Sequence, residues 1–476
     1  MFKKKIMFNF SEKESIFFPT IFINLSHYFL YMQTASKKVI NGWTMYDWAN
    51  SVYSLVITST IFPAYFESVT ANNANNEIMF LGRKFVNTAL YNYALGIAFL
   101  IVAIISPMLS SIADYKGNKK SFLRFFCFLG SLSCGLLFFF KGTNTLWIAI
   151  LCIILASIGF WGSLVFYNSY LPEIAAPEDR DRVSAKGFSM GYIGSVILQL
   201  FCFVFVFKPE WFSMQNDPTM PARFSFLLVG IWWFGFAQVT LTRMPKGTPA
   251  AFRPEKNLFT NGFIELKKVF HQLKHMLVLK RFLLAFFFYN MGVQTIMLVA
   301  ALFGSKQLKL PTGKLIITIL IIQVVAIGGA HLMARLSEKF GNFQTLLGVV
   351  IIWILVCIGA YQISVLSERG VNAEIYFYVL AAVVGLVMGG IQALSRSTYS
   401  KLMPITKDTT SFFSFYDVTE KIGIVIGMFS FGLIEELTGS MKNSVLVVMS
   451  FFIIGFILLF FTLKKEKFLK AGRKLY

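Results

Sequence analysis

Charged residues are scarce in this sequence. Asp, Glu, Lys and Arg make up 14% of its 476 residues, whereas 56% are hydrophobic and Phe alone occurs 54 times. A soluble domain usually carries about a quarter charged residues. This scarcity excludes an ordinary soluble protein and indicates a chain that crosses a membrane many times.

Cysteine and histidine are also few. The five cysteines all lie in hydrophobic runs and form no C-x-x-C pair, and there are four histidines. A disulfide framework and a thiolate metal site are therefore not indicated. The sequence has no G-x-x-x-x-G-K-[ST] loop for a nucleotide and no H-E-x-x-H pair. We expect no metal, no cofactor and no enzymatic activity.

Hydrophobic runs long enough to cross a bilayer, about 20 residues each, fill most of the chain. We identify twelve of them: 43–66, 86–111, 122–140, 146–170, 187–207, 224–241, 282–303, 315–334, 343–366, 375–394, 412–433 and 445–463. The sequence therefore predicts an all-α membrane protein with twelve transmembrane helices.

Positive charge is unevenly distributed over the predicted loops. The net charge is +21, and most loop Lys and Arg residues fall on the side that would hold residues 33–42 and the segment after 463. By the positive-inside rule this side is cytoplasmic. We predict that both termini are inside, that the protein lies in the cell (inner) membrane, and that the basic residues face lipid headgroups rather than nucleic acid.

The chain repeats itself. The longest loop, 243–281, separates two predicted halves, 43–242 and 282–463, each with six spans. The segment ADYKGNKK (113–120) after the second span corresponds to SEKFGNFQ (337–344) after the eighth. Two six-helix pseudo-repeats in parallel are typical of transporters that work by alternating access.

Both ends lie outside the repeat. Residues 464–476 form a basic tail that we expect to be cytoplasmic. Residues 1–42 form an N-terminal extension in which 1–31 have three interpretations: a weak thirteenth helix, a signal peptide, or upstream sequence that is not translated if Met32 is the start. We favour the third.

The paired short loops are candidate gates. A carboxylate at the end of a helix can cap the next helix or pair with a basic residue, and glycine permits the tight turn. The residues that we assign to these gating loops are Asp114, Gly117, Lys119, Lys120, Glu338 and Gly341. Any tight cytoplasmic hairpin offers a purely structural alternative, but the repetition favours a latch.

Several segments resemble a known family. ADYKGNKK is similar to the loop between the second and third helices of the major facilitator superfamily, with Tyr115 in place of the usual Arg. YDWANSVYSLVITSTIFPAYF (46–66), QALSRSTYSKLMP (392–404) and SFYDVTEKIGIVIGMFSFGLIEELTG (414–439) resemble a branch that includes fungal vacuolar amino-acid effluxers of the autophagy pathway and bacterial relatives. The resemblance covers about 41–463. It implies the major facilitator fold and a secondary transporter that exports amino acids.

Polar residues inside the spans are candidates for the substrate or coupling site. Asp47 and Asn50 share one helix face in the first span. They either face a cavity, where Asp47 could bind a proton, or Asp47 is a cap bonded to a neighbouring helix. Asn290 and Gln294 form a similar pair in the seventh span, the repeat partner of the first.

Three ionisable residues cluster in the eleventh span. Asp417 and Lys421 have the spacing of an intrahelical ion pair, and Glu420 lies one turn from Asp417. They indicate either a water-filled cavity or an ordinary ion-paired interfacial turn.

His271 and His275 have the spacing of helical metal ligands, but they lie in a basic amphipathic stretch of the central loop, for which we expect a helix on the cytoplasmic leaflet.

These features predict a secondary active transporter that moves a small solute by alternating access. Its expected partners are a small-molecule substrate such as an amino acid, protons as coupling ion, and the lipid bilayer. Two alternatives remain open: a polytopic membrane enzyme acting on a lipid or lipid-linked substrate, and a sensor or scramblase without transport activity on the same fold.

Overall fold

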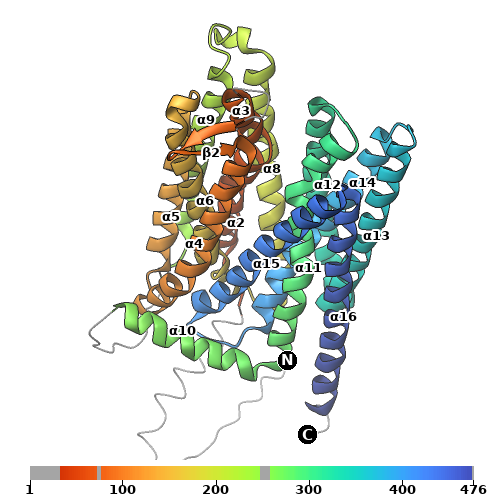
Figure 1. Ribbon diagram of the computed structural model, residues 1–476. Coiled ribbons are helices and arrows are strands. Elements are labelled where there is room, and N and C mark those ends of the chain that lie inside the picture. Colours follow the sequence, from red (N-terminus) through yellow and green to blue (C-terminus); the bar gives the residue numbers. More distant parts are fainter. Residues whose placement is uncertain (1–32, 72–76, 247–257, 474–476) are drawn as a thin grey trace, which may run out of the picture.

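The computed structural model describes residues 33–71, 77–246 and 258–473 (Figure 1). The three interpretations of residues 1–31 therefore concern residues outside the described part of the chain. Most of the N-terminal extension, 1–42, also lies outside the described residues.

The described residues are mostly helical. The first group of long helices is α2 (Lys37–Val52), η1 (Tyr53–Thr60), α3 (Ile61–Thr70), α4 (Asn87–Lys116), α5 (Lys119–Leu136), α6 (Leu146–Asn168), α8 (Arg180–Phe207) and α9 (Met220–Arg243). The second group is α11 (Leu277–Leu302), α12 (Thr312–Phe340), α13 (Asn342–Glu368), α14 (Glu374–Leu402), α15 (Thr409–Thr438) and α16 (Met441–Arg473). Shorter elements are β1 (Glu77–Phe80), β2 (Arg83–Val86), η2 (Leu137–Phe139), η3 (Thr143–Thr145), α7 (Leu171–Ile174), η4 (Pro209–Phe212), α10 (Leu258–His275) and η5 (Phe303–Gln307).

Ten helices in the described residues are long and apolar enough to cross a membrane. Two further long helical stretches accompany them. In one, α2, η1 and α3 follow each other without a break, and in the other, α15 carries three ionisable residues near its middle. The architecture is consistent with the twelve predicted helices.

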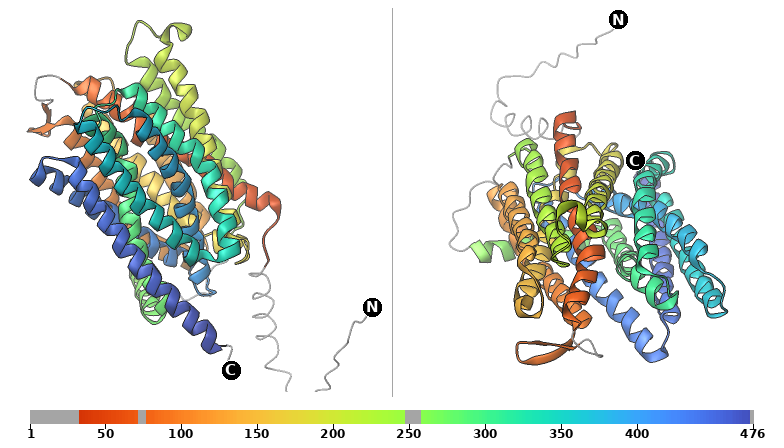
Figure 2. Two further views of the ribbon diagram at one scale, coloured as in Figure 1. Left: turned by 90° about the vertical axis from the view of Figure 1, so that its right-hand side faces the viewer. Right: turned by 90° about the horizontal axis from the view of Figure 1, so that it is seen from above.

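Each group of helices has its own hydrophobic core. One buried cluster is built from residues between Ile40 and Met244, and the other from residues between Val269 and Leu463 together with Tyr192. The two groups lie side by side (Figure 2). We call the face at which α2 begins and α16 ends the terminus face. Helix α10 runs across it (Figure 1).

The first transmembrane stretch contains a π-helical segment. The Thr58 hydroxyl donates to the Ser54 carbonyl at 2.6 Å, and the Thr60 hydroxyl donates to the Leu55 carbonyl at 2.7 Å. Such side-chain bonds compete with the regular helical pattern, and Pro63 shortly afterwards cannot donate a backbone hydrogen bond. The run of hydroxyl residues and the proline together account for the wider turn.

Some boundaries differ from the predicted ones. Helix α14 extends to Leu402, and α16 extends to Arg473 through much of the predicted tail. Residues 77–85, predicted as a loop before the second span, form the β1–β2 hairpin together with Val86. A hydropathy pattern predicts the end of a span where polar residues begin. The helix itself continues when these polar residues form hydrogen bonds or ion pairs.

Candidate functional site

The two helix groups are joined mainly toward the terminus face. Most hydrogen bonds and ion pairs between described residues of the two groups lie near this face. They join parts of α2, α4, α5, α7 and α8 to facing parts of α12, α14 and α15. No such bond joins residues 87–105 of α4 to residues 422–438 of α15, on the opposite side. The terminus face is therefore closed by polar contacts.

A buried ion pair crosses this interface. Arg396 of α14 lies 3.4 Å from the Asp47 carboxylate of α2. Asp47 is 5% exposed and Arg396 2%. The Tyr167 hydroxyl also donates to Asp47, at 2.7 Å. Asp47 therefore binds one partner in each helix group.

The Arg396 guanidinium is almost fully satisfied by other neighbours. It donates to the Asn168 side chain at 3.1 Å and to both the hydroxyl and the carbonyl of Ser184 at 2.9 Å. It also lies over the rings of Trp43 and Phe188, at 4.7 and 4.2 Å from their centroids. A buried charge with this many partners is held in one geometry, and loss of any partner is costly.

Close packing leaves no spare room around the ion pair. A Cβ at Gly187 would overlap the Asp47 carboxylate and approach the Arg396 guanidinium. Asn50, one turn from Asp47, is also buried, but its side-chain nitrogen has no hydrogen-bond partner in the described structure. The structure brings Asp47 to the interface without joining Asn50 to the ion pair.

A second contact caps a helix of the other group. The Asp114 carboxylate, at the end of α4, accepts hydrogen bonds from the backbone N–H groups of Thr410 and Ser411 at 3.2 and 2.7 Å, and from the Ser411 hydroxyl at 2.8 Å. These N–H groups belong to the first turn of α15, whose own N-cap residue makes no capping bond. Asp114 therefore supplies the missing cap and places a negative charge at the positive end of the helix dipole.

The other residues of this predicted gating loop hold the turn. Gly117 has a φ of +63°, which favours glycine. Lys119 is buried, pairs with Glu173, and lies 4.1 Å from the centre of the Tyr170 ring. Lys120 donates to the Met244 carbonyl at 3.0 Å.

A third contact occupies the pseudo-symmetric position. Asp181, at the start of α8, accepts hydrogen bonds from Ser337, Asn342 and Lys401 of the other group at 2.7, 2.7 and 2.6 Å. Glu338, which corresponds to Asp114 in the sequence, is exposed and takes part in none of these bonds. Gly341 beside it has a φ of +92°. The carboxylate of this contact therefore comes from the helix start instead of the turn.

We expect Asp114→Asn to weaken the closed terminus face. The neutral asparagine amide lacks the negative charge with which Asp114 accepts hydrogen bonds from the two N–H groups. A cap weakened by about 1 kcal/mol raises the population of the open state about fivefold. Distances between spin labels at the exposed Lys116 and Lys407 measure this population. Glu338→Gln is the matched control and should leave the distances unchanged. Identical distributions in Asp114→Asn and the wild type would contradict a latch.

A charged cluster lies farther from the terminus face, near the middle of α15. The Lys421 ammonium is 2.7 Å from Asp417 and 3.2 Å from Glu420. Gln294 of α11 donates to Glu420 at 2.8 Å. The structure therefore brings four predicted site residues together. Asn290, a further predicted site residue, lies one turn from Gln294 on α11, and its buried side-chain nitrogen has no partner among described residues.

This cluster also contacts the first helix group. The Lys421 ammonium lies 3.8 Å from the centre of the Trp161 ring of α6, and the Ser106 hydroxyl of α4 donates to Asp417 at 3.5 Å. The side chains of Lys421 and Asp417 are 1% and 6% exposed, whereas Glu420 is 16% exposed. Glu420 is thus the carboxylate most accessible to a solute.

The charges of the cluster do not balance. Two carboxylates face one ammonium. An uncompensated negative charge in the hydrocarbon region is unfavourable, so a further cationic partner would stabilise this cluster. This arrangement can bind a proton or a substrate amine.

The two histidines of the central loop lie on α10, outside the charged cluster of α15. His271 and His275 approach each other on α10 with 3.3 Å between their Nε2 atoms, and no group of three potential metal ligands occurs in the described residues. Helix α10 buries Val269 and Leu273 against the second core and exposes Ile264 and Phe270. It is an amphipathic helix at the terminus face.

The sequence interpretation missed several residues of the site. Arg396 lies two residues beyond the predicted span 375–394, although it falls in one of the segments that resemble the family, 392–404. Small hydroxyl residues in a helix permit close packing against another helix. The sequence around Arg396 is rich in them, and this pattern indicates a buried helix face: Ser395, Ser397, Thr398 and Ser400. Asp181, Tyr167 and Trp161 had no comparable signal.

Comparison with solved structures identifies the fold. The proton:xylose symporter XylE matches with a TM-score of 0.65, covering 89% of this chain and 94% of that one at 12% identity. The E. coli fucose:proton symporter FucP matches with a TM-score of 0.60, covering 89% and 97% at 15% identity. These likenesses confirm the predicted all-α membrane architecture of the major facilitator type.

Comparison of sequences identifies the family. The MFS-type transporter YxiO of Bacillus subtilis (strain 168) is 31% identical over 90% of this chain and 96% of its own length. Autophagy-related protein 22 of Saccharomyces cerevisiae is 27% identical over 86% of this chain and 88% of its own. The family described as "Vacuole effluxer Atg22 like" matches residues 35–471. The chain therefore belongs to the family described as "Vacuole effluxer Atg22 like", within the major facilitator superfamily, and it is a transporter of the major facilitator type.

Proposed function

We propose that the protein is a secondary active transporter that exports an amino acid, or a similar small amine, in exchange for protons. Its two halves, 43–242 and 282–463, rock about a central site. The terminus face is cytoplasmic, and the membrane is the inner membrane of the cell.

The observation that carries this proposal is the charge imbalance of the cluster on α15. Two carboxylates share one ammonium, and Glu420 is partly exposed. A substrate ammonium group or a proton can neutralise the same negative charge, so the two compete. Competition of this kind couples the outward movement of an amine to the inward movement of a proton.

The position of the interface contacts supports alternating access. Asp47–Arg396, Asp114 and Asp181 all join the halves on one side of the cluster. A state with the terminus face closed is thus stabilised by contacts that must break for the site to open there. The excess of basic residues around that face supports a cytoplasmic orientation.

Transport of a panel of amino acids in proteoliposomes, with and without an imposed pH gradient, tests the proposal. We expect at least one amino acid to accumulate, and its accumulation to depend on the gradient. Asp47→Asn should slow this transport, because Arg396 then lacks its carboxylate partner. Failure of the whole panel, or transport that ignores the gradient and survives the mutation at full rate, would contradict the proposal.

A further inference from the structure

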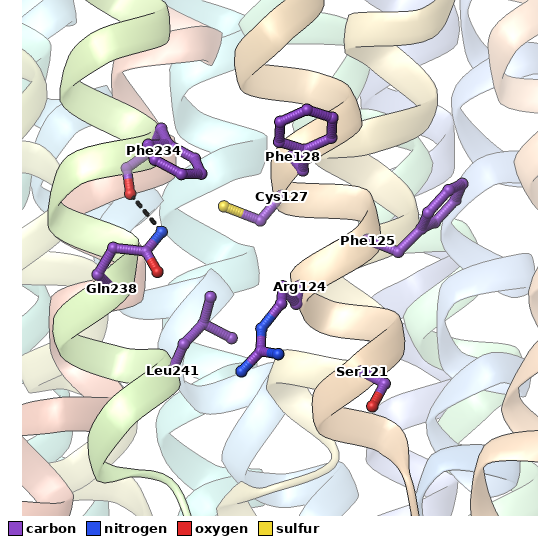
Figure 3. Close-up of a pocket in the computed structure, with 8 residues that line it drawn as sticks. All are labelled: Ser121, Arg124, Phe125, Cys127, Phe128, Phe234, Gln238 and Leu241. Carbon is purple, nitrogen blue, oxygen red and sulfur yellow. Dashed lines mark hydrogen bonds between the residues drawn. The ribbon is translucent and has the colours of Figure 1, made fainter.

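A groove lies on the outer side of the first helix group, between α5 and α9. Its volume is about 370 Å³. The exposed rings of Phe128 and Phe234 lie at one end, while Arg124 and Leu241 lie at the other (Figure 3). Gln238 donates to the Phe234 carbonyl at 2.8 Å, so one of its two amide N–H groups is already used. The groove is therefore mainly apolar, with a cation at one end.

The charged end lies close to the terminus face. Arg124 is the sixth residue of α5, so it lies about 8 Å from the start of that helix. Leu241 occupies the last turn of α9. A bilayer has its phosphate groups near this depth, whereas Phe128 lies about one turn deeper, beside the acyl chains.

Positive charge is concentrated at this end. Lys120 lies close enough to both Arg124 and Lys246 to be repelled by each of them. Arg124 is exposed and forms no ion pair with any residue in the described part of the chain. The Arg124 guanidinium lies between α5 and α9 (Figure 3). None of these three cations pairs with a carboxylate of the described residues, so together they form a site for an anion.

We propose that this groove binds one anionic phospholipid of the leaflet at the terminus face. The headgroup phosphate accepts hydrogen bonds from Arg124, whose planar guanidinium suits a phosphate. One acyl chain lies along the rings of Phe128 and Phe234. The lipid bridges α5 and α9 within a single helix group. The site is therefore independent of the substrate site and of the proposed function.

Native mass spectrometry of the full-length protein, solubilised from vesicles of phosphatidylglycerol and phosphatidylcholine, tests this site. We expect the wild type to retain one phosphatidylglycerol in preference to phosphatidylcholine. Arg124→Gln should lower this retention about fivefold, the effect of one basic residue at a membrane surface. Gln238→Trp should lower it as well, because the indole fills the groove without changing its charge.

Arg335→Gln is the matched control, since Arg335 is an exposed cation at the same face in the other helix group. It should retain the lipid as the wild type does. Unchanged thermal unfolding midpoints would show that the variants are folded. Inorganic phosphate alone should not displace the lipid, because it has no acyl chain. Equal retention of phosphatidylcholine, displacement by phosphate, or undiminished retention in Arg124→Gln would each overturn the proposal.

Discussion

Arg396→Gln should abolish transport and lower the free energy of unfolding by about 3–5 kcal/mol. The substitution leaves the Asp47 carboxylate buried with only the Tyr167 hydroxyl as partner. It also removes the hydrogen bonds that the guanidinium makes to Ser184 and Asn168. Thermal or denaturant unfolding in detergent and transport in proteoliposomes measure the two effects.

A double-mutant cycle separates the ion pair from general damage. Asp47→Asn combined with Arg396→Gln should recover part of the lost stability, because no unpaired charge remains. It should not recover transport. Lys208→Gln is the control: it breaks an exposed pair with Glu210 at 3.8 Å, and it should cost less than about 1 kcal/mol. If Arg396→Gln were as mild as this control, the ion pair would not hold the interface.

Glu420→Gln should lower proton-driven accumulation of the substrate about tenfold or more. The variant keeps the Asp417–Lys421 pair and the contact to Gln294, but it removes the unbalanced negative charge. Without that charge the cluster attracts a proton or a substrate amine less strongly. Exchange of substrate across the membrane without net accumulation should persist.

The control for this variant is on the same helix. Glu436 is exposed near the far end of α15, so Glu436→Gln should accumulate substrate at the wild-type level. Accumulation in the two variants is compared in the same vesicles under the same gradient. Full gradient-driven accumulation by Glu420→Gln would place the coupling carboxyl elsewhere.

Hydrophobic runs predicted the long helices and their order, because length and apolarity alone determine whether a segment can cross a bilayer. Local spacing also predicted the Asp417–Lys421 pair, which is seen at 2.7 Å. Such features depend only on neighbours in the sequence. They could therefore be read without knowledge of the tertiary structure.

The contacts between the halves could not be read in this way. Asp114 was predicted to cap or pair locally, whereas its partners Thr410 and Ser411 belong to the other half of the molecule. The repeat predicted a matching role for Glu338, but Ser337 and Asn342 make the contact with a carboxylate from α8. The two halves pack with different side chains at equivalent places. Which side chains make these contacts is determined by how the two halves pack against each other.

We expect the two faces to open and close reciprocally, and paired spin-label distances measure this movement. One label pair replaces Lys116 and Lys407 at the terminus face, and the other replaces Glu67 and Glu436 at the opposite face. All four positions are exposed, and the five native cysteines are buried. In Arg396→Gln we expect the terminus-face distance to lengthen while the opposite distance shortens. Distances that stay fixed, or that change in the same direction, would contradict it.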